Sequence, residues 1–415
     1  MDLKKIKLDK LLLIFTLVFI CLYNFLSYFN TPWSVSEDSL HQVRRMGILT
    51  TGLIIGAFAF LFVLTLFLIF SKKYSTKIII PVIFLELFGF IWTAYAVLID
   101  KVSIGVLFRD SFPPISMMAC GFILAGYNDK WWPLIKKAIF IIACLFTFYS
   151  FYEIVIAFSK FGFEYRITYG APMYCYEIGL FATFGLIILT DEWKKNRKLL
   201  VFILVVLLFF NSAILQGRSW FLQTVILFVI YLFNIKEVLK KHKTLAIFVP
   251  VGIITITLVI FLSNIELFEG LIDRFVNSGD TRTSQLEQFF SQVSFEELLI
   301  GQGTKASYTY NLDTNFHFID NQVLLFMFRY GIVPTICYCY LILYPVIKSL
   351  ILRNKRLFYR SLVLLFWFAA MIGVSVYFSI SLGIMSLLIL LYSGRLFYEI
   401  DNRKKILLEN KVNRG

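Results

Sequence analysis

The sequence has little charge, and long stretches have none at all. Only 16% of its 415 residues are Asp, Glu, Lys or Arg, whereas 59% are hydrophobic and 18% are aromatic. A water-soluble domain cannot bury so large a hydrophobic fraction, and this composition is typical of a polytopic membrane protein. The shortage of charge therefore excludes an ordinary soluble enzyme or binding domain.

Cysteine and histidine are also scarce, and neither is arranged for chemistry. The six cysteines all lie in apolar stretches, so we expect no disulfide framework. The three histidines, His41, His242 and His317, do not have metal-ligand spacing, so the sequence predicts no metal and no cofactor. The net charge of +14 is divided among short clusters between apolar runs, as the positive-inside rule requires, which argues against a nucleic-acid partner.

Apolar runs long enough to cross a membrane recur along the whole chain. At about 20 residues a span, we expect an all-α polytopic membrane protein with about 12 transmembrane helices, residues 1–415 forming one integral membrane domain. Basic clusters near both ends predict cytoplasmic termini. The first run lacks a cleavage site and is expected to be retained. Pro113-Pro114 breaks the fourth run, and Pro334 is expected to kink the tenth. The expected spans are residues 11–29, 47–70, 78–99, 115–127, 138–158, 173–190, 199–215, 220–233, 244–262 and 321–347, with two more within 361–394.

One long hydrophilic stretch interrupts this pattern, and we expect residues 264–319 to form a large external loop between the ninth and tenth spans. Ser284 to Glu287 and Ser294 to Glu297 both fit the capping-box pattern that begins a helix. Gly301 is expected to end the second helix. The first helix places apolar residues on one face, so we expect two short amphipathic helices on the outer membrane surface, acting either as a lid or as a packed surface loop. The residues on that face are Leu286, Phe289, Phe290 and Val293.

The few cations expected on the outer face are mostly arginine. Of the 40 Lys and Arg residues, 29 fall in the inner clusters, and the other 11 comprise eight arginines and three lysines. Arginine grips phosphate in bidentate fashion, so the bias indicates an anionic substrate, although arginine also snorkels at span ends. Arg218 lies in a turn between two spans, where a charge is costly. Arg282 lies near an expected helix N-terminus, a position that favours anions.

Asp320 and His317 are the candidate general bases. Asp320-Asn321 opens the expected tenth span three residues after His317, and spacings of three share a helix face. A carboxylate or imidazole at this place is able to deprotonate a sugar hydroxyl. The alternatives are an N-cap for the Asp-Asn pair and an ordinary loop histidine.

The run LIGQG followed by DNQVLLFMFRYG resembles the signature of the Wzy-type O-antigen and capsular polysaccharide polymerases and the related O-antigen ligases. In that superfamily a G-x-G in the large external loop is followed by H-N-x-x-L-x-x-x-x-x-x-G at the next span. Matching positions here are Gly301, Gly303, Asn321, Leu324 and Gly331, while Arg218 and Arg282 resemble the family's arginines. The family histidine position holds Asp320, which makes Asp320 the first candidate base and His317 the second.

The resemblance implies a metal-independent glycosyltransferase in the bacterial cytoplasmic membrane. It would transfer a growing glycan from undecaprenyl pyrophosphate onto a lipid-linked repeat unit at the outer face. Arg218 and Arg282, supported by Arg166 and Arg274, would stabilise the departing pyrophosphate. The implied partners are the two lipid-linked substrates, membrane lipid, and possible chain-length regulator and flippase proteins. An O-antigen ligase and a lipid-linked oligosaccharide flippase are the alternatives, although a flippase is expected to show repeats that this sequence lacks.

Overall fold

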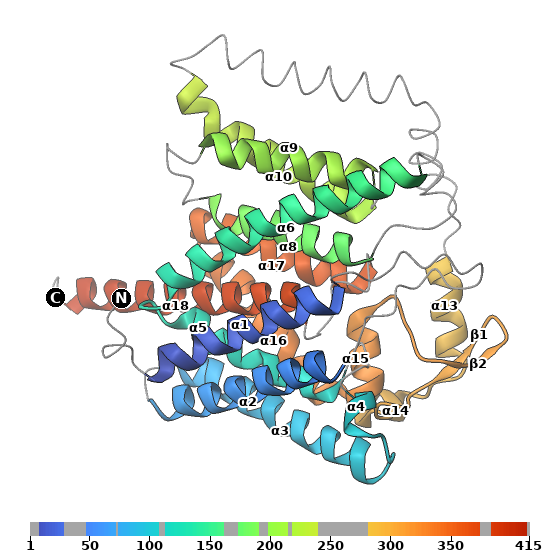
Figure 1. Ribbon diagram of the computed structural model, residues 1–415. Coiled ribbons are helices and arrows are strands. Elements are labelled where there is room, and N and C mark those ends of the chain that lie inside the picture. The colour runs from blue at the N-terminus through green and yellow to red at the C-terminus, as the bar shows by residue number, and fades with distance from the viewer. Residues whose placement is uncertain are drawn as a thin grey trace. The chain divides into compact units, whose positions relative to one another are not determined.

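The computed structural model describes residues 8–28, 47–71, 74–107, 113–161, 173–190, 198–214, 218–239, 281–373 and 383–412 (Figure 1). The chain divides into two compact units. The first comprises Met1–Thr31, Val43–Ile135 and Thr281–Gly415, and the second comprises Pro32–Gln42 and Lys136–Asp280. Residues 281–319 of the expected large loop and the first three expected spans therefore belong to the first unit.

Six of the described helices are long and apolar enough to cross a membrane. This finding confirms a membrane protein built mainly from α-helices. The six are α1 (Leu8–Tyr28), α2 (Ile48–Phe70), α3 (Thr76–Leu98), α6 (Trp132–Phe161), α16 (Ile332–Ile351) and α17 (Lys355–Gly373).

The expected total of twelve spans stays a prediction. Several described helices have shorter apolar stretches, and the expected span 244–262 lies outside the described residues. The helices that do not reach a full span by length and composition are η2 (Pro114–Gly121) with α5 (Phe122–Tyr127), α8 (Met173–Ile188), α9 (Lys198–Ile214), α10 (Arg218–Leu239) and α18 (Ile384–Val412).

The predicted break in the fourth span is confirmed at Pro113. Its backbone is extended (φ −69°, ψ 148°), and the 3₁₀ helix η2 begins at the next residue. Proline disfavours helical conformation in the residue before it, so the short helix α4 (Ile104–Leu107) cannot run on through this point. After this break, the expected fourth span consists of the 3₁₀ helix η2 followed by α5 and is not one regular α-helix.

The tenth expected span, residues 321–347, is wrong as a single kinked helix. It consists of α15 (Gln322–Tyr330) and α16, separated by Gly331 with φ 89° and ψ 173°. Pro334 was expected to cause a kink, but it lies in the first turn of α16, where its missing N–H breaks no hydrogen bond. The backbone of Gly331, rather than the proline ring, separates the loop from the span.

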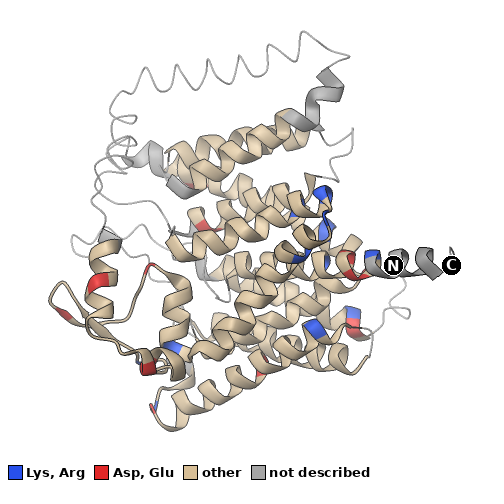
Figure 2. Cartoon of the chain, turned by 180° about the vertical axis from the view of Figure 1, so that it is seen from behind, with Lys and Arg blue, Asp and Glu red and all other residues tan. Residues whose placement is uncertain are grey.

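A network of charged and aromatic side chains fixes the end of the first unit where α16 leads into α17. Arg395 donates from Nη1 to Asp129 Oδ1 (2.7 Å) and from Nε to Glu399 Oε1 (3.0 Å), and Glu399 also pairs with Arg360. The Arg395 guanidinium lies over the ring of Tyr398, 4.9 Å from its centroid. Figure 2 shows the charged residues gathered mainly at helix ends, with the helix middles almost entirely uncharged.

The second unit packs α6, α8, α9 and α10 around buried polar side chains. Trp220 is fully buried and donates from Nε1 to Thr183 Oγ1 (3.1 Å). The hydroxyls of Ser212 and Thr224 lie 2.8 Å apart, which joins α9 to α10. A Cβ atom on Gly179 would lie 2.0 Å from the Trp220 ring, so the absence of a side chain on α8 makes room for the indole. This packing anchors the first turn of α10, which begins at Arg218.

Candidate functional site

Residues 281–331, which we call the loop module, form a small folded structure with its own apolar core. It contains α13 (Thr281–Phe290), α14 (Phe295–Ile300), the antiparallel pair β1 (Tyr308–Tyr310) and β2 (Asp313–Phe316), and α15 (Figure 1). Phe289 is fully buried and makes edge contacts with the rings of Tyr308 and Phe328. The hairpin was not predicted. The buried core of the module consists of Phe289, Leu298, Ala306, Tyr308, Ile319, Leu324, Leu325 and Phe328.

The helix signals in the module were correct at α14 and wrong at the start of α13. Ser294 Oγ accepts from the Glu297 N–H, and Glu297 Oε2 accepts from the Ser294 N–H, so the predicted capping box is confirmed. Ser284, in contrast, lies inside α13, which begins at Thr281; its hydroxyl accepts from Gln288 Nε2. The Ser-x-x-Glu pattern also fits a helix interior, and the helix simply begins one turn earlier.

The expected apolar face of α13 is confirmed except at Phe290. Leu286 and Val293 pack against the core beside Phe289. Phe290 is 57% exposed and points away from that core. Two further aromatic and aliphatic side chains are exposed on α14, where Phe295 is 69% and Ile300 is 73% accessible. The module therefore shields one apolar surface and presents another.

Gly301-Gln302-Gly303 runs beside the end of α15 and supplies its missing hydrogen bonds. The Gln302 N–H donates to Phe328 O and the Gly303 N–H donates to Arg329 O, both at 2.8 Å. Trp92 of α3 donates from Nε1 to Tyr330 O (3.1 Å). The last carbonyls of a helix have no partner within the helix, so these three donors complete α15. The predicted helix stop at Gly301 is confirmed, with φ 93°.

Two of the three glycines of the motif, Gly301 and Gly331, are required by close backbone contact. A Cβ on Gly301 would lie 2.6 Å from Gly331 N, and one on Gly331 would lie 2.5 Å from Ile300 O. Gly303, with φ 80°, faces the end of α3, where Thr304 donates to Asp100 Oδ2 (3.2 Å). The G-x-G and the later glycine thus form one contact that fixes the loop module to α3 and to the start of α16.

His317 is held in one tautomer by the backbone. Its Nδ1 lies 2.8 Å from Ala306 O, and because a carbonyl oxygen only accepts, the neutral ring carries its proton on Nδ1. Nε2 is then left with its lone pair available, and the side chain is exposed to solvent. This is the arrangement that a general base requires.

Asp320 and Asn321 have different roles in the backbone. Asn321 is the N-cap of α15, with Oδ1 accepting from the Leu324 N–H (3.0 Å). Asp320 precedes the cap, and its N–H donates to Gln285 Oε1 of α13 (2.9 Å). The expectation that His317 and Asp320 share a helix face is wrong, because α15 begins only at Gln322. Because α15 begins at Gln322, the N-cap is Asn321 and not Asp320, whose residue is half-buried.

Arg329 is a buried cation in this module that the sequence reasoning did not assign to the site. Its side chain is only 4% exposed, and Nη2 donates to His317 O (3.2 Å). Buried guanidinium groups are rare unless they are paired. Arg329 therefore links α15 directly to the segment that carries both candidate bases. Its position inside the matched DNQVLLFMFRYG run was the available signal.

The four arginines expected to bind pyrophosphate are only partly described. The backbone places Arg218 first in α10 and Arg282 second in α13, so both lie in the first turn of a helix. Their side chains, and all of Arg166 and Arg274, lie outside the described residues. Arg218 belongs to the second unit and Arg282 to the first.

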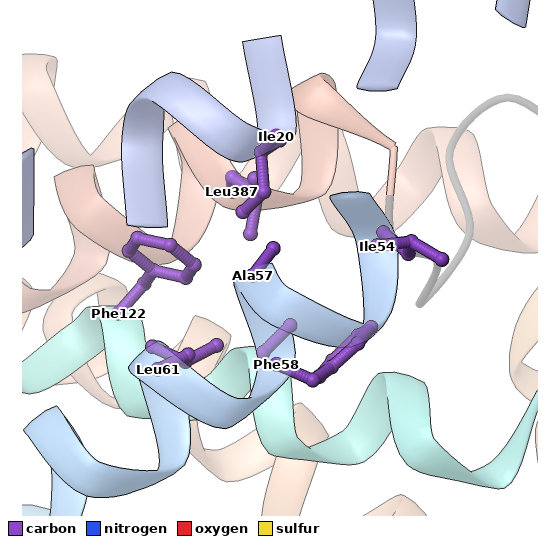
Figure 3. A pocket seen from close by; sticks show the side chains of 8 residues that line it. Ile20, Ile54, Ala57, Phe58, Leu61, Phe122 and Leu387 are labelled. Carbon is purple, nitrogen blue, oxygen red and sulfur yellow. The ribbon is translucent and has the colours of Figure 1, made fainter. Parts of the chain in front are cut away.

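A narrow cavity in the first unit, with a volume of only about 10 Å³, is apolar and carries none of this chemistry. It lies between α1, α2, η2, α5 and α18 (Figure 3). The eight lining residues, none of them titratable, are Ile20, Ile54, Ala57, Phe58, Leu61, Ala119, Phe122 and Leu387.

Compared with protein-family models, with curated proteins and with solved structures, the chain matches none of them. Its function therefore has to be inferred from the residues of the loop module themselves.

Proposed function

We propose that the protein is a polysaccharide polymerase of the membrane, a glycosyltransferase that moves a growing glycan from undecaprenyl pyrophosphate onto a lipid-linked repeat unit. The observation that supports this proposal most is the geometry of His317. Its Nδ1 is committed to Ala306 O, and its Nε2 is available as a base in a segment that also contains Asp320.

In the proposed reaction an acceptor sugar hydroxyl attacks the anomeric carbon of the donor glycan. The bond between that carbon and the pyrophosphate oxygen breaks, and the pyrophosphate leaves on its lipid with the electron pair. The hydroxyl proton passes to His317 Nε2 or to the Asp320 carboxylate. Arg282, in the first turn of α13, is proposed to neutralise the charge that grows on the pyrophosphate, with Arg218 as a second phosphate-binding residue. Attack opposite the leaving group would invert the anomeric centre.

The two candidate bases rest on different arguments. Asp320 occupies the family's histidine position in the motif, which favours the carboxylate. The fixed tautomer of His317 favours the imidazole, because a positioned base needs its acceptor atom directed outward. In either case the acceptor atom is held by the same segment, since Gln285, Tyr308 and Arg329 all bond to backbone atoms of residues 317–320.

The membrane is proposed to supply proximity between the two substrates. Both carry polyprenyl chains and would share one leaflet, which removes much of the entropy cost of their encounter. The exposed apolar side chains of α14 support this placement. Ile300 is exposed and lies directly before Gly301, whose backbone contacts Gly331 at the start of the α16 span, so this exposed side chain lies near the end of that span.

The test is a gel of lipid-linked glycan from a deletion strain complemented with single variants. The deletion is expected to accumulate single repeat units. Long unattached polymer would identify a ligase instead, and glycan trapped on the cytoplasmic side would identify a flippase. His317→Ala and Asp320→Asn separate the bases, since loss of a general base lowers the rate by roughly 100-fold or more.

The matched control is Asp313→Asn, which makes the same chemical change on an exposed residue of the hairpin. Asparagine retains an oxygen that can accept the hydrogen bond now made by the Asn315 N–H. Normal polymer from both His317→Ala and Asp320→Asn, at wild-type protein levels, would refute the proposed base. Normal polymer from Arg282→Ala would refute the proposed pyrophosphate contact.

A further inference from the structure

Glu86 is an acidic side chain in the middle of a membrane span. It lies ten residues after the start of α3, which is about 15 Å along the helix axis at 1.5 Å per residue. The hydrocarbon core of a bilayer is about 30 Å thick, so this position is close to its centre. Lys77, in the first turn, is the other charged residue of α3. An ionisable residue at such depth is rarely retained without a role.

The Glu86 carboxyl group is buried by protein and has no hydrogen-bond partner. The residue is only 7% exposed, and neither Oε1 nor Oε2 is bonded to any described group. No described Lys, Arg or His is paired with it. Among the described residues, no group therefore stabilises a negative charge on Glu86.

The elements packed on this part of α3 include η2 and α16, and Phe62 of α2 contacts Phe90. Gly89, one turn beyond Glu86, brings η2 so close that a Cβ there would lie 3.4 Å from both Met117 Cβ and Pro114 O. One described titratable side chain of these elements, Cys120 of η2, lies within electrostatic range of Glu86. Cys337 and Tyr338 of α16 lie within range of Cys120, and none of the three side chains carries a positive charge.

We propose that Glu86 is a proton-binding site inside the membrane, occupied by a proton in the resting protein. Moving an unpaired carboxylate out of water costs many times more than moving the neutral acid, which keeps only a polar O–H and C=O. Since no described cation or hydrogen-bond donor lies beside it, the proton is the ligand that removes the charge. Release of that proton would leave a charge between α3 and η2, and these helices would have to separate or admit water.

The site is placed to affect the loop module. Glu86 precedes Trp92 by six residues on the same helix, and Trp92 donates to Tyr330 O at the end of α15. Beyond it, Asp100 accepts from Thr304 of the loop. Proton binding at Glu86 thus stabilises the helix that supports the glycine contact, independently of which reaction the loop module performs.

Infrared spectroscopy of the full-length protein in lipid nanodiscs tests the proposal. A protonated carboxylic acid has a C=O stretch separate from those of carboxylates and amides. We expect wild-type protein at neutral pH to show such a band, Glu86→Gln to lose it, and the exposed-residue control Glu296→Gln to retain it. Identical acid bands in wild type and in well-folded Glu86→Gln would overturn the proposal, because Glu86 would then be ionised.

Carbodiimide labelling of the wild-type protein gives a second test that requires no variant to fold. A protonated carboxyl adds its O–H across the N=C=N group of dicyclohexylcarbodiimide, and the acyl group then shifts to nitrogen, so the whole reagent is retained and nothing leaves. We expect labelling of Glu86 to exceed that of Glu296 by about 100-fold at neutral pH, because exposed carboxyls are almost fully ionised there. If Glu86 were not labelled, the proposal that a proton occupies the site would be refuted. If sodium ions suppressed the labelling at constant pH, the proposal would also be refuted, because the site would then bind sodium.

Discussion

Replacing Gly331 by alanine should detach the G-x-G segment from the end of α15. The new Cβ would lie 2.5 Å from Ile300 O and 2.8 Å from Leu299 O, and both are backbone atoms that cannot rotate away. The residue also has φ 89°, which costs an L-residue about 1 to 2 kcal/mol. Relieving the overlap costs roughly 1 to 3 kcal/mol more.

Separation of the two backbones also removes two hydrogen bonds, Gln302 N–H to Phe328 O and Gly303 N–H to Arg329 O. Each contributes about 1 kcal/mol net. The backbone strain and the overlap by themselves should lower the local free energy of opening by roughly 3 kcal/mol, which is about 100-fold in the open population at 1.4 kcal/mol per factor of ten, and the loss of the two hydrogen bonds adds to this effect.

Hydrogen–deuterium exchange of the full-length protein in detergent measures this directly. The amides of Gln302 and Gly303 should exchange about 100-fold faster in Gly331→Ala. The matched control is Gly52→Ala in α2, where a Cβ meets no atom within 4 Å and the helix should gain up to about 1 kcal/mol. Protection at residues 302 and 303 that is the same in both variants would refute the proposed role of the glycine contact.

Three other perturbations have defined outcomes. Asn321→Ala removes the N-cap of α15 and should lower the stability of the loop module by about 1 kcal/mol. Asn321→Asp keeps an accepting oxygen and should change that stability little. Hydrogen–deuterium exchange of the Leu324 amide, whose N–H bonds to Asn321 Oδ1, measures the difference between the two variants. Burial raises the pKa of Tyr308 well above its ordinary value, so the module should lose stability as the pH rises above about 10, where the unfolded tyrosine ionises and the folded one does not. Tyr308→Phe loses the hydrogen bond to Phe318 O, but its thermal stability should decline less at alkaline pH than that of the wild type. An equal decline in the two proteins would contradict this reasoning. Gly179→Ala places a Cβ 2.0 Å from the Trp220 ring and should displace that indole, seen as a shift in tryptophan fluorescence that Gly52→Ala does not produce.

The glycan and proton-site experiments test separate claims. Loss of polymer in His317→Ala or Asp320→Asn concerns the loop module, whereas the infrared band of Glu86 concerns the interior of α3. A protein that proves to be a ligase or flippase would still be expected to hold a proton at Glu86.

The sequence alone predicted the features that depend on neighbouring residues. Its hydropathy indicated membrane helices because about 20 consecutive apolar residues are enough to define a span. The break at Pro113, the capping box at Ser294 and the helix stop at Gly301 each depend on local backbone sterics or on hydrogen bonds within one turn. These predictions were confirmed because no distant part of the chain competes with them.

Tertiary structure decided the features that join residues far apart in the chain. Gly331 contacts residues about thirty positions earlier in the chain, and this contact divides the expected tenth span into two helices. The local sequence had instead predicted a kink at Pro334. The tautomer of His317 is set by Ala306 O, and Phe290 is exposed because Phe289 alone turns into the core. Periodicity shows which residues share a face of a helix. Only the packed structure shows which backbone meets that face and which polar groups it satisfies, because those partners come from other elements of the fold.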